Sequence, residues 1–336
     1  MFSVLKRIVM HYDVFNGDAD GIISLLQLRM AQPQISTLIT GVKRDIKLLQ
    51  QVALCSDVSG VTVLDISMEK NSDALYSLID RDVPIFYCDH HRAGDVPQAD
   101  NFTALIDLDA QVCTSLLINR HLKGRFVEWA LVGAYGDNLF AVADTLADEC
   151  GLSLAQKQFL KELGILINYN GYGAVIDDLN ISPATLFTQL MTYSSPFLLE
   201  DDFNSPYHFL KQAYDADLAY LKSLHPIEDT EIVSIYELPC EAWARRISGV
   251  FGNTLANEAP NKAHAVLTLN QNRQDYTVSV RAPLNHRTGA DDICCQFPSG
   301  GGRKAAAGIN QLPISDKNKF IKAFTSFYQE QLENTL

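Results

Sequence analysis

The stretch Pro84-Ile85-Phe86-Tyr87-Cys88-Asp89-His90-His91 is a short apolar run that ends on three polar, metal-competent side chains. This pattern indicates a buried β-strand with a functional site at its carboxyl end, where open α/β sheets place their chemistry. Two other stretches have the same form. Residues 12–15 lead into Asn16-Gly17-Asp18-Ala19-Asp20-Gly21, and residues 61–64 run into Asp65. We therefore expect acids and histidines from three strands to share one site.

Residues 1–145 alternate between short β-branched runs and helical patterns, which is typical of parallel βαβ units. In this region we predict helices at 44–54 and 69–79, the second with Ser67 as its N-cap. The predicted fold class is α/β. It has a parallel-sheet N-terminal catalytic domain (1–195), a helical linker (196–230) and a smaller α/β C-terminal substrate-binding domain (231–336), with a cleft between the two domains.

Composition limits the classes of partner and location. The chain has 336 residues, 47% of them hydrophobic, which is enough for a sizeable core. Seven scattered cysteines without a Cys-x-x-Cys pair favour reduced thiols and a cytoplasmic location. We predict neither a membrane span nor a secretory leader. Because the formal net charge is −13, long duplex nucleic acid is disfavoured as a partner, and an anionic substrate must be small.

The acids and histidines at the strand ends indicate a metal site. One such acid alone is commonly a helix cap. Several carboxylates gathered at one edge of a sheet repel one another unless a cation lies among them. Oxygen ligands with an imidazole suit Mn²⁺ or Mg²⁺, and the absence of cysteine from the cluster argues against structural zinc.

Four ordered motifs over the first 140 residues resemble the DHH phosphoesterase superfamily. The name-giving triplet is Asp89-His90-His91, and the first motif, Asp-x-Asp-Gly, is matched by Asp18-Ala19-Asp20-Gly21. Asp65 closes an apolar strand as the second motif requires, and Asp137 in Gly136-Asp137-Asn138 matches the fourth.

The resemblance implies a two-metal centre, with two Mn²⁺ as the expected ions and Mg²⁺ or Co²⁺ as substitutes. Asp65 would bridge the ions, Asp18 would serve one of them, and the other would be held by Asp20, His90 and Asp137. His91 would lie near the substrate phosphate, and Asp89 would orient the histidines. The catalytic set implied is Asp65, His90 and His91, which would act with metal-activated water on phosphorus.

One position departs from the family pattern. Many relatives carry a histidine just upstream of the first Asp pair, where this chain has Asn16 and Val14. We expect Asn16 to support the site through its amide, and the ion held by Asp18 to bind more weakly than the other.

A glycine-rich stretch, Ser299-Gly300-Gly301-Gly302-Arg303-Lys304-Ala305-Ala306-Ala307-Gly308, is a candidate anion-binding element. Backbone N–H groups of Gly300, Gly301 and Gly302 can approach a phosphate, and we expect a helix to follow and to offer its N-terminal dipole. The stretch also resembles the Gly-Gly-Gly-x-x-x-Ala-Ala-Gly signature of the DHH-associated C-terminal domain. That resemblance disfavours the family II pyrophosphatase branch, and it implies nucleotide contacts from Arg281, Arg303, Lys304 and His286.

Three functions remain open at this point. The first is a manganese-dependent phosphodiesterase that acts on short oligoribonucleotides or on linear or cyclic dinucleotides. The second is a RecJ-type single-strand exonuclease, which the acidic charge disfavours. The third is a non-catalytic nucleotide-binding protein. A small nucleotide is the expected partner, no membrane is, and a homodimer is left open.

Overall fold

The computed structural model describes residues 9–333. The prediction about a secretory leader concerns residues 1–8, which lie outside the described residues. The chain divides into two compact units, Met1–Tyr214 and Asp215–Leu336. The division falls inside the stretch 196–230 that we predict as a helical linker, and α9 (Leu198–Asp201) and α10 (Pro206–Leu221) lie there. None of the described helices is both long and apolar enough to cross a membrane.

The first unit is built on a five-stranded sheet in which every strand pair is parallel. The strand order is β2-β1-β3-β4-β5. The bounds are β1 (Met10–Phe15), β2 (Ser36–Ile39), β3 (Val58–Leu64), β4 (Ile85–Asp89) and β5 (Phe102–Ile106). The predicted α/β class and the parallel sheet are therefore confirmed, and the carboxyl ends of all five strands lie at one edge.

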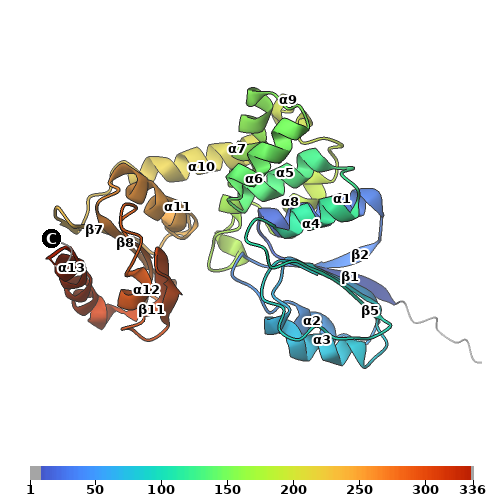
Figure 1. The fold of residues 1–336 in the computed structure, drawn as a ribbon, viewed down its shortest axis with the longest axis horizontal. Helices are drawn as coiled ribbons and strands as arrows, with labels where there is room; N and C mark the ends of the chain where they lie inside the picture. The colour runs from blue at the N-terminus through green and yellow to red at the C-terminus, as the bar shows by residue number, and fades with distance from the viewer. Residues whose placement is uncertain (1–8, 334–336) are drawn as a thin grey trace, which may run out of the picture. The chain divides into compact units, whose positions relative to one another are not determined.

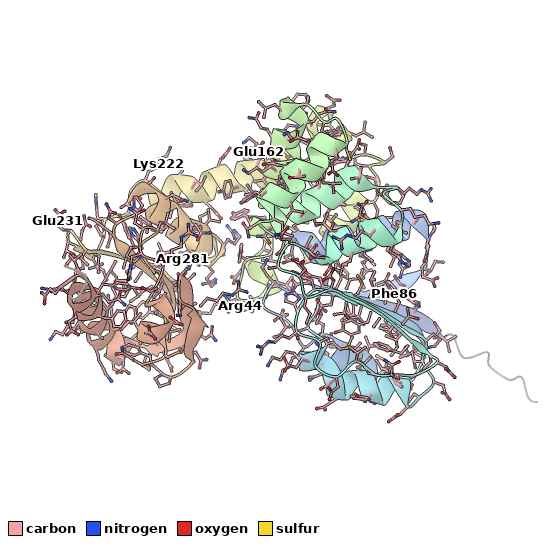
Figure 2. All side chains as sticks on the ribbon, viewed as in Figure 1. Arg44, Phe86, Glu162, Lys222, Glu231 and Arg281 are labelled. Carbon is pink, nitrogen blue, oxygen red and sulfur yellow. The ribbon has the colours of Figure 1, made fainter. Side chains whose placement is uncertain are left out.

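Helices cover both faces of this sheet (Figure 1). One face packs against α1 (Ala19–Ala31), α4 (Thr114–His121) and α5 (Val127–Gly136), and the other against α2 (Leu49–Ala53) and α3 (Ser72–Ile79). Further helices extend the first of these layers: α6 (Phe140–Glu149), α7 (Leu154–Asn170) and α8 (Pro183–Leu190). Figure 2 shows the side chains that fill the layers, with Phe86 marking β4.

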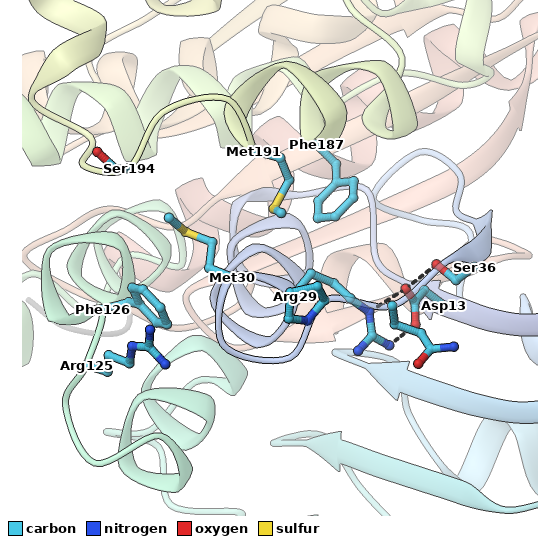
Figure 3. A pocket seen from close by; sticks show the side chains of 11 residues that line it. Asp13, Arg29, Met30, Ser36, Arg125, Phe126, Phe187, Met191 and Ser194 are labelled. Carbon is cyan, nitrogen blue, oxygen red and sulfur yellow. Dashed lines mark hydrogen bonds and ion pairs between the residues drawn. The ribbon is translucent and has the colours of Figure 1, made fainter.

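Strand alternation decides which side chains enter which layer. In β1, Tyr12 and Val14 belong to the core with α2 and α3, whereas Phe15 belongs to the core with α1. Asp13 is fully buried and is held by Arg29 of α1, whose Nε donates to Asp13 Oδ2 at 2.8 Å (Figure 3). Ser36 Oγ donates to the same oxygen at 2.6 Å. A buried charge is thus paired and hydrogen-bonded, as the low polarity of the interior requires.

Helices α5 and α7 approach closely because glycine lies at their contact. A Cβ on Gly164 would collide with the Val132 carbonyl oxygen and lie 2.8 Å from the Gly136 nitrogen. We predict that Gly164→Ala destabilises the protein by about 1–3 kcal/mol, because the two helices must move apart. Chemical denaturation measures the change. Gly249→Ala is the control, since a Cβ there meets no atom within 4 Å and should be neutral or stabilising in its helix. A neutral Gly164→Ala would contradict the close approach.

The second unit contains a mixed six-stranded sheet of order β10-β11-β9-β8-β7-β6. Its strands are β6 (Glu228–Asp229), β7 (Val233–Leu238), β8 (Ala263–Leu269), β9 (Asp275–Arg281), β10 (Gly300–Arg303) and β11 (Ala306–Pro313). Among the described strands of this second sheet, only β7 and β8 form a parallel pair. Its core includes residues of α12 (Ala290–Cys294) and α13 (Lys317–Glu333), and a smaller cluster packs under α11 (Ala242–Glu258).

Three local predictions were wrong, and one helix was missed. Residues 44–48 are not helical, because α2 begins only at Leu49. Ser67 is not an N-cap: its Oγ donates to the Arg92 carbonyl at 2.9 Å, and a 3-10 turn, Glu69–Asn71, precedes α3. Helix α6 was not anticipated. No helix follows the three glycines, which instead form β10 of a hairpin with β11.

Candidate metal centre

Three neighbouring strands deliver the predicted acids and histidines to one edge of the first sheet. Asp18 caps α1 directly after β1, and its Oδ1 accepts the Gly21 N–H at 3.1 Å. Asp20 lies in the first turn of the same helix. Asp65 follows β3 with a left-handed φ of 58°, which Asp tolerates better than a branched residue does. The other members come from the end of β4 and from the residue after α5: Asp89, His90, His91 and Asp137.

The His90 imidazole is the centre of this cluster. Its Nε2 lies 3.5 Å from Asp65 Oδ1, 3.8 Å from Asp20 Oδ2 and 3.9 Å from Asp137 Oδ2. Its Nδ1 lies 2.9 Å from the Val112 carbonyl oxygen. Because a carbonyl can only accept, Nδ1 carries a proton. In the neutral ring the lone pair is then on Nε2, which faces the carboxylates. A lone pair aimed at anionic oxygens is the arrangement that a bound cation requires.

Backbone groups of α4 fix the Asp20 carboxylate. The N–H groups of Thr114 and Ser115 donate to its two oxygens at 2.8 and 2.7 Å. The Thr114 hydroxyl donates to Asp65 Oδ1 at 3.2 Å. The start of α4 therefore holds two of the predicted ligands in place, and each carboxylate oxygen keeps a second lone pair for an ion.

Crowding of acids gives the cluster a strong demand for positive charge. Burial, with Asp20 and Asp18 nearby, raises the pKa of Asp65 well above its usual value. Burial and the same two neighbours raise the pKa of Asp137 to about 7. The ligand atoms of Asp20, His90 and Asp137 lie within 4.8 Å of one another, as do those of Asp65, His90 and His91. Carboxylate oxygens and one imidazole fit a divalent ion such as Mn²⁺ or Mg²⁺.

His91 and Asp89 form a pair beside the centre. Asp89 is fully buried, and its Oδ1 accepts a hydrogen bond from His91 Nδ1 at 2.7 Å. The His91 side chain is 46% exposed, so solvent reaches it. Although burial alone would lower the pKa of His91, the hydrogen bond to Asp89 raises it above its usual value.

Lys43 and Asn168 also belong to the site, and our sequence analysis missed both. The Lys43 ammonium donates to Asp18 Oδ2 at 2.6 Å and to Asn168 Oδ1 at 2.9 Å. Burial alone would lower the pKa of Lys43, but Asp18, Tyr172 and Asp137 raise it above its usual value. A signal for Lys43 was available, because it follows β2, a parallel neighbour of β1 whose carboxyl end lies at the same edge.

Asn16 contacts protein groups on both sides of its amide. Its Oδ1 accepts the Asp18 N–H at 3.2 Å, and its Nδ2 donates to the Lys43 carbonyl at 3.2 Å. The amide therefore ties the first motif to the segment that carries Lys43.

The predicted nucleotide contacts lie in the second unit. Arg281 at the end of β9 donates through Nε to Asn253 Oδ1 at 2.7 Å and through Nη1 to Ser279 Oγ at 2.8 Å. Gly300, Gly301 and Gly302 form the edge strand β10, paired on one side with β11. Gly302 has a φ of 147°, and a Cβ there would collide with Ala307. Three further candidates have exposed side chains near or in this hairpin: Arg303, Lys304 and His286.

The first unit also contains a cavity of about 540 Å³ (Figure 3). Its lining includes Asp13, Arg29, Phe187 and Met191 and contains none of the predicted ligands. Because Asp13 and Arg29 of the lining already pair with each other, we assign no function to this cavity.

The fold and the cluster together define an α/β protein with a candidate metal-binding site at the carboxyl edge of a parallel sheet. No family model matches the sequence, and a search of curated proteins found no match. Several solved structures are similar to the chain, and three of them are described here. The DHH domain of a member of the s1p family of ribosomal proteins is 15% identical, with a TM-score of 0.58 over 95% of this chain and 86% of that one.

RecJ from Thermus thermophilus, solved with Mn²⁺, is 16% identical, with a TM-score of 0.62 over 96% of this chain and 52% of that one. The chain thus spans about half of RecJ. The pGpG-specific phosphodiesterase PggH from Vibrio cholerae is 13% identical, with a TM-score of 0.56 over 96% of this chain and 99% of that one. The protein therefore has the fold of the DHH superfamily, and the resemblance predicted from the four motifs is confirmed at the level of the fold.

Proposed function

We propose that this protein is a metal-dependent phosphoesterase that hydrolyses phosphodiester bonds of small nucleotides, either short oligoribonucleotides or linear or cyclic dinucleotides. The observation that carries the proposal is the convergence of three carboxylates on His90 Nε2 within 3.9 Å. Two similar structures support it, since one is described with Mn²⁺ and the other as a pGpG-specific phosphodiesterase. Manganese is the ion we propose, in a cytoplasmic protein.

Asp20, Asp65, His90 and Asp137 would hold the ion. When bound, a divalent ion lowers the pKa of a coordinated water and polarises a phosphoryl oxygen. The residues of the chain supply the rest. The Val112 carbonyl fixes the ring of His90, and the start of α4 fixes Asp20. His91, which donates a hydrogen bond to Asp89, would hold a proton for the leaving oxygen.

The C-terminal unit would supply positive charge for binding a nucleotide phosphate. Strand β10 pairs with β11 on one side only, and the Gly300 N–H donates to the Phe297 carbonyl at 3.1 Å. The other edge of β10 would be open to an anion without a helix N-terminus. Arg303 and Arg281 would bind nucleotide phosphate, since a guanidinium holds phosphate by a two-pronged contact. With a net charge of −13, the chain would repel a long polyanion beyond these groups.

A substrate panel tests the proposal. With Mn²⁺ present, we predict that hydrolysis per chain is at least about tenfold faster on linear or cyclic dinucleotides than on single strands of about 30 nucleotides, because only the short substrate avoids repulsion by the acidic surface. Product release resolved by chromatography gives the rates, and a chelator should abolish them. As a control, Asp100→Asn, which replaces an exposed acid before β5, should leave these rates unchanged.

The panel also weighs a second candidate. The similarity to RecJ, at a TM-score of 0.62, favours a single-strand exonuclease. A clear preference for the longer strand would support that function and refute ours. No hydrolysis of any substrate in the presence of Mn²⁺ would favour a non-catalytic nucleotide-binding protein.

A further inference from the structure

The Asp18 carboxylate already has a cation. The family resemblance assigns one of two metal ions to Asp18, yet its Oδ2 accepts a hydrogen bond from the Lys43 ammonium at 2.6 Å. Its Oδ1 accepts the Gly21 N–H at 3.1 Å, at the start of α1. Both oxygens are therefore engaged by donors of the chain, and one of those donors carries a full positive charge.

The position of Lys43 is built by three segments of the chain. Its backbone N–H donates to the Gly171 carbonyl at 2.9 Å, and its carbonyl accepts from Asn16 Nδ2 at 3.2 Å. A Cβ on Gly17 would collide with the carbonyl oxygen of Gly41, so the segment that carries Lys43 packs directly on the first motif. Hydrogen bonds thus hold the Lys43 backbone through both its N–H and its carbonyl, and its side chain reaches Asp18.

We propose that the ammonium of Lys43 takes the place of one of the two metal ions implied by the resemblance, so that each chain binds a single divalent ion. This inference rests on the proposed metal centre, whose ligands are Asp20, Asp65, His90 and Asp137. The same Lys43 would supply the positive charge that a second ion gives elsewhere.

The remaining donors do not suit a second ion. A divalent ion on Asp18 Oδ2 would lie within a few ångströms of the ammonium, and the like charges would repel strongly in a partly buried site. The amide oxygen of Asn16, at the position where relatives carry histidine, accepts the Asp18 N–H. Asp65 would be left with His91, whose Nδ1 lies 3.8 Å from Asp65 Oδ1 but already donates to Asp89 Oδ1 at 2.7 Å. These are too few protein ligands for a stable second site.

The Lys43 ammonium keeps one donor for the substrate. An ammonium has three N–H groups, and among the described residues Asp18 and Asn168 accept two of them. The Lys43 side chain is 28% exposed, so the third N–H can reach an acceptor that enters from solvent. A phosphoryl oxygen held by the metal centre is the acceptor that this arrangement fits.

Metal stoichiometry tests the inference without relying on activity. After equilibrium dialysis against Mn²⁺, the wild type should contain one ion per chain, with the EPR spectrum of an isolated Mn²⁺ rather than of an exchange-coupled pair. Asp18→Asn should still bind one ion, because Asp18 does not hold it. Asp20→Asn should bind Mn²⁺ at least about tenfold more weakly, the scale of losing one ligand group. Lys43→Ala should gain a second, weaker site, and Lys47→Ala, an exposed lysine of the same segment, should match the wild type.

Each outcome decides for or against the proposal. Two ions in the wild type, falling to one in Asp18→Asn, would overturn it while leaving the proposed phosphoesterase function intact. One ion in the wild type without nucleotide hydrolysis would uphold it and refute the function. A wild type that binds no Mn²⁺ would overturn both. If Lys43→Ala fails to fold, the comparison of the wild type with Asp18→Asn decides alone.

Discussion

Replacement of Asp65 by Asn is expected to reduce Mn²⁺-dependent hydrolysis by at least about 10³-fold, the scale of losing one group that stabilises developing charge. The metal-free protein should keep its stability or gain some. Asp65 lies 3.5 Å from His90 Nε2 and is crowded by Asp20 and Asp18. The substitution removes an anionic ligand from the ion, and it also removes one of several acids that repel one another in the absence of the ion.

The structure gives reasons to expect that the Asp65→Asn chain folds. Asn tolerates the left-handed backbone at this position, where φ is 58°. Its amide oxygen can still accept the Thr114 hydroxyl, which is 3.2 Å from Asp65 Oδ1. Thermal unfolding of metal-free wild type and variant measures the stability, and initial rates on a dinucleotide measure the activity.

Asp100→Asn serves as the control for a general loss of negative charge, because Asp100 is exposed and precedes β5 at the amino edge of the sheet. It should change neither rate nor stability. Full activity in Asp65→Asn would exclude Asp65 as a metal ligand. Equal losses of activity and of stability would instead identify it as a structural residue.

The edge where the acids meet was predictable because it depends on local patterns alone. An apolar run of strand length followed by Asp or His is visible in the sequence, and parallel pairing brings such ends together without further information. The structure accordingly gathers Asp18, Asp20, Asp65, His90 and Asp137 near one another.

Lys43 could have been predicted from its place after β2, but Asn168 could not, because its relation to Lys43 is not local. They lie 125 residues apart, and no spacing rule connects a loop after β2 with the last turn of α7. The prediction of a helix after the three glycines was wrong for another reason. Its alanines favour a helix by propensity, but Ala306 and Ala307 pair with Arg281 and Val280 of β9, and this sheet pairing overrides the local preference.

The replacement with the largest expected effect on stability is Arg29→Met. We predict a loss of about 3–5 kcal/mol in the free energy of unfolding, because Asp13 would remain as a buried carboxylate without its cation. Arg29 contacts both Asp13 oxygens (Figure 3). It also donates to Thr62 Oγ1 at 2.9 Å, so the replacement removes several contacts at once. Urea denaturation measures the loss.

The pH dependence of this loss has a definite sign. Burial alone would raise the pKa of Asp13, but the hydrogen bonds from Arg29 and His11 lower it from 3.8 to about 2. A carboxyl with a lowered folded-state pKa contributes stability that is fully present above pH 3.8 and is lost as the pH falls through 2. The difference between wild type and Arg29→Met should therefore be small near pH 2 and should grow toward pH 7.

The double variant Asp13→Asn with Arg29→Met separates the charge from the packing. It should be more stable than Arg29→Met alone, because a neutral amide tolerates burial with only Ser36 and His11 beside it. A loss below about 1 kcal/mol in Arg29→Met, as for an exposed ion pair, would show that solvent reaches Asp13. A loss that does not vary with pH would assign the effect to the apolar part of the Arg29 side chain, which lines the cavity beside Phe187.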